Sequence, residues 1–160
     1  MRPRIHRHLA AIVLFITLPA CGREATPTMP STPRSFLEGV WTGTLTIDRE
    51  DEATTSGSTT WTFEVVQGTN LQTFNVRIQS QHPFLPITAT VTSAITPSNT
   101  PPARISTQGN YASPRGCTGS LLSVGTAETR TIDADFSGVD CPTLEHSTFR
   151  GRVQLTKTGS

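Results

Sequence analysis

Residues 39–48 read GVWTGTLTID, with a large apolar side chain at almost every second position. Trp41, Leu45 and Ile47 fall on one face of an extended chain, and the threonines between them fall on the other face. A period of two is typical of a strand that buries one face and exposes the other to water. This stretch therefore predicts a β-strand over Val40–Asp48.

The same alternation returns in seven later segments, and no window after Phe36 shows apolar residues at helical spacing. Segments rich in proline, such as Thr96–Pro102, interrupt the pattern and cannot continue a strand. A polar loop is expected over Arg49–Thr59. The later strands are expected at Thr60–Gln67, Gln72–Gln81, Ile87–Ile95, Arg104–Tyr111, Cys117–Val124, Arg130–Phe136 and Thr148–Thr156.

Eight short strands with one apolar face each predict an all-β domain over residues 36–160. We expect a single antiparallel up-and-down β-barrel of eight strands, because closure removes exposed sheet edges. A two-sheet β-sandwich is the alternative. In the barrel the inward-facing aromatic residues are Trp41, Trp61, Phe63, Phe74, Phe136 and Phe149.

The N-terminal segment has the layout of a secretory signal. Three arginines lie within residues 1–8, and the apolar run Leu9–Leu18 follows them. That run is shorter than the roughly 20 residues of a membrane-spanning helix. We therefore expect export, with residues 1–20 as the signal peptide.

The end of that segment, Leu18-Pro19-Ala20-Cys21, resembles the lipobox of bacterial lipoproteins. The resemblance implies that Cys21 receives a diacylglycerol and that signal peptidase II cuts before it. An ordinary secretory signal, with Cys21 incidental, is the alternative. In enteric bacteria, Asp directly after the lipidated cysteine keeps a lipoprotein at the inner membrane. This chain has Gly22 at that position, so the resemblance implies anchoring at the outer membrane, facing the periplasm or the cell exterior. The proline-rich residues 21–35 predict an extended spacer.

Composition limits the partners and the redox state of the exported part. Of thirteen Lys and Arg residues, three lie in residues 1–20, and twelve acidic residues balance the rest, so no nucleic-acid partner is expected. Besides Cys21, the chain has Cys117 and Cys141. Outside the cytoplasm such a pair predicts a disulfide.

The first strand also carries a family resemblance. Gly39-Val40-Trp41 is similar to the signature that opens the lipocalin and wider calycin barrels. The resemblance implies that Trp41 closes one end of the core and that a basic residue of the last strand, Arg150 or Arg152, packs on its indole. More loosely, Gly39–Gly43 is similar to the start of small secreted bacterial barrels.

Nothing in the sequence matches a catalytic, phosphate-binding or metal-binding motif, so no enzyme, cofactor or metal site is expected. Three clusters of polar residues could each have a functional role: a paired-carboxylate or cation site, a calcium-binding loop, and a metal ligand or catalytic base. A solvated surface is the favoured interpretation of each. The clusters are Asp133 with Asp135, Glu50-Asp51-Glu52, and Glu145 with His146.

The expected protein is thus a membrane-anchored, non-enzymatic barrel, for which three roles are open. The six inward aromatic residues would line a cavity for a small apolar ligand, although a filled core is favoured. A filled barrel would instead act as an envelope interaction or assembly protein. The third role is a protease inhibitor, with Ser80–Pro86 as the inserting loop.

Overall fold

The structure is a computed structural model that describes residues 34–49, 53–68, 71–97, 99–142 and 147–159. The predicted signal peptide, Cys21 and nearly all of the predicted spacer lie outside these ranges. The same is true of the candidate residues Glu50, Asp51, Glu52, Glu145 and His146.

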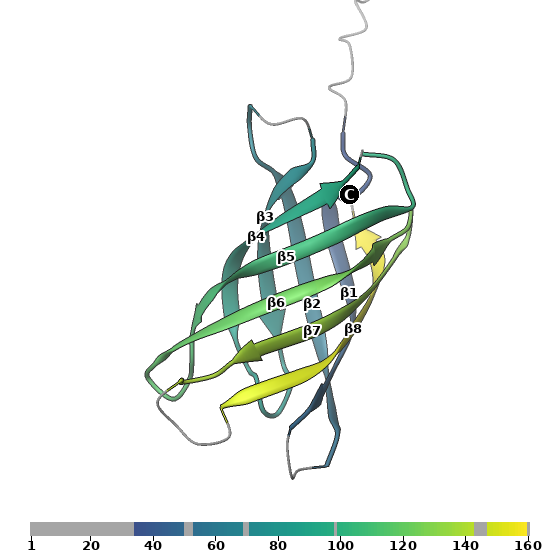
Figure 1. Cartoon of the computed structure of the whole chain (residues 1–160). Coiled ribbons are helices and arrows are strands. Elements are labelled where there is room, and N and C mark those ends of the chain that lie inside the picture. The colour runs from purple at the N-terminus through teal and green to yellow at the C-terminus, as the bar shows by residue number, and fades with distance from the viewer. Residues whose placement is uncertain (1–33, 50–52, 69–70, 98, 143–146, 160) are drawn as a thin grey trace, which may run out of the picture. The chain divides into compact units, whose positions relative to one another are not determined.

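Eight antiparallel strands form a closed barrel in chain order, with β8 paired to β1 (Figure 1). The predicted all-β barrel is confirmed, and the sandwich alternative is wrong because the ladder closes. In the described ranges, no helix is long and apolar enough to cross a membrane. The strands are β1 (Gly39–Asp48), β2 (Thr55–Val65), β3 (Thr73–Ser80), β4 (Thr88–Thr96), β5 (Ala103–Ala112), β6 (Thr118–Ala127), β7 (Thr131–Val139) and β8 (Thr148–Gly159).

One predicted loop is partly wrong. The expected loop Arg49–Thr59 ends early, because β2 begins at Thr55 and pairs with β1 from Ile47 onward. Serine and threonine side chains fit the solvated face of a strand, so their polarity does not mark the segment as a turn.

The core is filled because large and small inward side chains complement each other. The strands β1, β2, β3, β7 and β8 supply the six predicted aromatic side chains, which are only 0–2 % exposed. A hollow wide enough for water would leave accessible area on the side chains that line it. Strands β4, β5 and β6 face these rings mostly with smaller residues, including Ala89, Ser93, Ala103, Thr107 and Ser123, all buried.

The rings contact each other in a continuous network. Phe63 packs at 6.2 Å, between ring centroids, from both Trp41 and Trp61, and at 6.0 Å from Phe74. Trp61 continues to Phe136 at 6.5 Å, and Phe136 stacks on Phe149 at 5.7 Å. Such edge and offset contacts add to the stability from burial alone.

The barrel has two distinct ends, which we name by the path of the chain. At the proximal end Arg34 enters, β8 finishes, and residues 66–72, 97–102 and 128–130 connect the strands. At the distal end residues 49–54, 81–87, 113–117 and 140–147 connect them. In Figure 1 the proximal end is uppermost.

Candidate functional site

The distal end is plugged by the segment 81–87, which folds onto the barrel mouth. His82 and Leu85 within it are buried. Nδ1 of His82 accepts a hydrogen bond of 3.1 Å from the backbone N–H of Phe84. Nε2 therefore carries the proton and donates to the carbonyl of Thr55 at 3.0 Å. A Cβ at Gly57 would meet the His82 Cα at 2.4 Å, so only glycine permits this approach.

Phe84, in the same segment, is half-buried. Its ring lies edge-on to Phe149 at 5.9 Å, between centroids. The guanidinium carbons of Arg49 and Arg115 lie 4.0 and 5.4 Å from the Phe84 centroid. Phe84 thus extends the core network to the surface and meets two cations there.

Two hollows lie at this end of the barrel. The first, about 240 Å³, is lined by Phe84, Arg115, Asp140, Ser113 and three exposed prolines, Pro83, Pro86 and Pro114.

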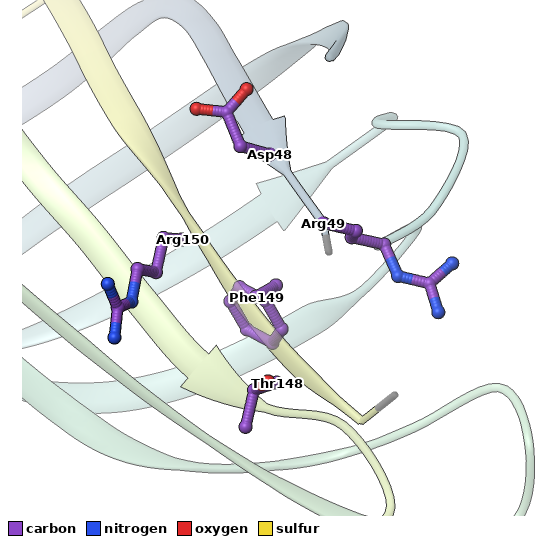
Figure 2. A pocket seen from close by; sticks show the side chains of 5 residues that line it. All are labelled: Asp48, Arg49, Thr148, Phe149 and Arg150. Carbon is purple, nitrogen blue, oxygen red and sulfur yellow. The ribbon is translucent and has the colours of Figure 1, made fainter. Parts of the chain in front are cut away.

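Figure 2 shows the second hollow, about 370 Å³, between the end of β1 and the start of β8. Asp48 and Arg150 are opposed in the β1–β8 ladder, and Arg49 and Thr148 extend the rim beyond them. Phe149 lies between these polar residues, and its side chain is buried. The hollow is therefore polar at its rim and backed by the core.

A buried carboxylate organises the neighbouring turn. Asp140, 2 % exposed, accepts a hydrogen bond of 3.0 Å from the hydroxyl of Tyr111, and Nε of Arg115 lies 3.6 Å from its other oxygen. Burial, and then the charge of Asp140, raises the pKa of the Tyr111 phenol well above its usual range.

The predicted disulfide joins the two distal turns beside Asp140. Cys117 and Cys141 are bonded, with their Cα atoms 5.4 Å apart, a usual separation for a disulfide. Their sulfurs and a carboxylate oxygen of Asp140 lie within 4.8 Å of each other. Since metal ligation needs thiolates, the bonded pair offers a structural link and no metal centre.

A basic residue of the last strand packs on the indole of Trp41, but the prediction that it is Arg150 or Arg152 is wrong. Lys157 supplies the cation, with Nζ 5.5 Å from the ring centroid, and Nζ also donates to the carbonyl of Phe36 at 2.7 Å. Arg150 and Arg152 face outward, because they alternate with the inward residues of β8. Lys157 lies an even number of positions after Val153, so it shares the inward face of β8. This spacing could have identified Lys157 as the residue that packs on Trp41.

The pair Asp133 and Asp135 lies on the outer face, as the alternation predicts. Both oxygens of Asp133 accept hydrogen bonds from Arg152, and this contact lowers the pKa of the Asp133 carboxyl. An exposed ion pair accounts for Asp133, and such pairs contribute about 0–1 kcal/mol to stability.

Comparisons of this chain with protein families, curated proteins and solved structures give no match. The interpretation of the distal end therefore depends on its own side chains. We define the distal surface as the residues Arg49, Pro83, Phe84, Pro86, Pro114, Arg115 and Arg150. Arginine and aromatic side chains are enriched at the centres of protein–protein interfaces. The distal surface carries both kinds of side chain in Arg49, Arg115 and Phe84.

Proposed function

We propose that this chain is a lipid-anchored extracytoplasmic protein that binds a partner protein of the bacterial envelope through its distal surface, without catalysis. The filled aromatic core carries this proposal. The six inward rings contact each other and are 0–2 % exposed, which favours a filled core over the cavity for a small apolar ligand considered from the sequence.

The distal surface is suited to docking because two of its segments are held in place by contacts with the barrel. His82 fixes the segment 81–87 through two backbone contacts, and the Cys117–Cys141 bond fixes the adjoining turns. Ordering loops on binding costs free energy, and a surface that is already ordered avoids that cost. Protease inhibition by Ser80–Pro86 has less support, because His82 and Leu85 point into the barrel mouth and are buried.

The anchor supplies the orientation. Acylation of Cys21 would tether the barrel through Arg34, at the proximal end. The distal surface lies at the other end of the barrel and would remain accessible in the envelope. Gly22 favours the outer membrane as the site of anchoring.

Site-specific photocrosslinking in intact cells tests this proposal. A photoreactive residue replaces Pro114, which is exposed on the distal surface, or Thr90, which is exposed on the outer face of β4. We expect a discrete adduct with one envelope protein from position 114 and none from position 90. The adduct should weaken when Phe84→Ala and Arg115→Ala are added. Equal adducts from both positions, or none from position 114, would refute distal docking.

A further inference from the structure

A second candidate surface lies at the proximal end, where a hollow of about 440 Å³ opens beside the entering chain. Three parts of the fold meet there: the segment before β1, the β6–β7 turn and the end of β8. The lining residues are Phe36, Thr129, Arg130, Lys157, Thr158 and Gly159.

The hollow combines an apolar side chain with two cations. Phe36 packs against the core cluster and stays partly exposed. Lys157 is held in place, because one of its ammonium protons is donated to the Phe36 carbonyl. Two further donors remain on that group. Arg130 is exposed in the β6–β7 turn, with a guanidinium suited to phosphate oxygens.

The charges around the hollow favour an anion. Arg34, at the entry of the chain, adds a third cation at this end of the barrel. Glu38 and Glu128 are the carboxylates of the adjoining segments. Burial lowers the pKa of Lys157, and the charge of Glu38 opposes this shift only in part. Cations exceed carboxylates here by a small margin, so we expect weak binding that depends on several charges.

The length of the chain places this end within reach of a bilayer. Arg34 is thirteen positions after Cys21. At about 3.1 Å per residue for a proline-rich chain, this gives an upper reach of roughly 40 Å. This is the greatest distance that the segment can span, and smaller distances between the barrel and the bilayer are also allowed. Contact between the proximal end and the lipid surface is therefore sterically permitted.

We propose that the proximal hollow binds the phosphate headgroup of an anionic phospholipid in the membrane that carries the anchor. Arg130 and Lys157 bind the phosphate, and Phe36 contacts the apolar part of the interface. Docking in this way would orient the barrel on its tether, with the distal surface directed away from the bilayer. This inference rests on the proposed anchoring for its biological setting.

Vesicle binding tests it without acylation. The chain from residue 21, carrying Cys21→Ser, contains the whole compact unit Pro33–Ser160. It is sedimented with vesicles of phosphatidylcholine, alone or mixed with phosphatidylglycerol. We expect binding only to the mixed vesicles. Each basic residue near an anionic surface contributes about fivefold to binding, so Arg130→Glu should weaken it roughly 25-fold and Glu128→Gln should strengthen it about fivefold.

Arg150→Glu is the matched control, because it changes the net charge equally at the distal end and should leave binding nearly unchanged. Melting curves establish that each variant is folded. Equal binding to both kinds of vesicle, or equal loss in Arg130→Glu and Arg150→Glu, would overturn the proposal. Failure here leaves acylation of Cys21 and distal docking untouched, since neither enters the measurement.

Discussion

The hydroxyl of Tyr111 donates a hydrogen bond of 3.0 Å to Oδ1 of Asp140, across 29 positions of sequence. Asp140 immediately precedes Cys141, so this bond connects the end of β5 to the turn that the disulfide fixes. The distal surface is therefore supported from beneath by a buried polar pair and a covalent link.

The Tyr111 phenol should remain protonated in the folded barrel above pH 10, because burial and Asp140 raise its pKa from 10.0. The unfolded chain loses this proton near pH 10 while the folded chain keeps it. The stabilising effect is therefore complete below pH 10 and is lost as pH rises further. Tyr111 is the single tyrosine, so phenolate absorbance should appear together with loss of the β circular dichroism. Phenolate formation near pH 10 in an intact barrel would contradict the burial of this pair.

Removal of the disulfide should destabilise the barrel without changing its fold. The bond closes a loop with a sequence separation of 24, for which the chain-entropy relation gives about 3.5 kcal/mol. Urea unfolding of the double variant Cys117→Ser/Cys141→Ser should show a loss of this size, and Cys21→Ser should show none. Two reactive thiols in the oxidised protein from residue 22 onward would show that the bond is absent.

Phe63→Ala should open a cavity in a core that is otherwise filled. Phe63 contacts three other rings, and truncation of a buried Phe costs about 3–5 kcal/mol. The variant should gain binding of a small apolar probe such as benzene, read from tryptophan fluorescence, whereas the parent protein should not respond. Phe63→Leu is the milder variant if Phe63→Ala fails to fold. Saturable binding by the parent protein would mean a hollow core.

Lys157→Met should weaken the proximal end, because it removes the cation beside Trp41 and the donor to the Phe36 carbonyl. The expected loss of unfolding free energy is about 0.5–2 kcal/mol. Arg150→Gln, on the outward face of β8, serves as the comparison and should change stability little. Equal losses from both variants would argue against a specific role for Lys157.

Period-two alternation predicted the eight strands and the inward set of aromatic residues, and the closed barrel was favoured over a sandwich because closure removes exposed sheet edges. It failed at strand ends where glycine interrupts the apolar pattern. β6 continues through Gly125 to Ala127, and a Cβ at Gly125 would meet the carbonyl oxygen of Asp133 at 2.2 Å. Glycine there permits close strand packing, so it signals continuation where the sequence suggested an end.

The distal surface could not be predicted from the alternation of apolar residues, because its side chains come together only when the barrel closes. Phe84 lies in a proline-rich segment without periodicity, and its contacts Arg49 and Arg115 come from other turns. Likewise, nothing local in the sequence relates Tyr111 to Asp140. Pairing of Cys117 with Cys141 was predictable because only two cysteines remain after Cys21 and the chain is expected to be exported.

The roles proposed for the two ends depend on a tether at Cys21, and mass spectrometry of the protein purified from bacterial membranes tests that tether most directly. The predicted result is a chain beginning at Cys21 that carries a diacylglyceryl group on its sulfur, with Cys21→Ala released from the membrane fraction. A chain that begins elsewhere, or an unmodified Cys21 in a protein that is not membrane-bound, would contradict the account.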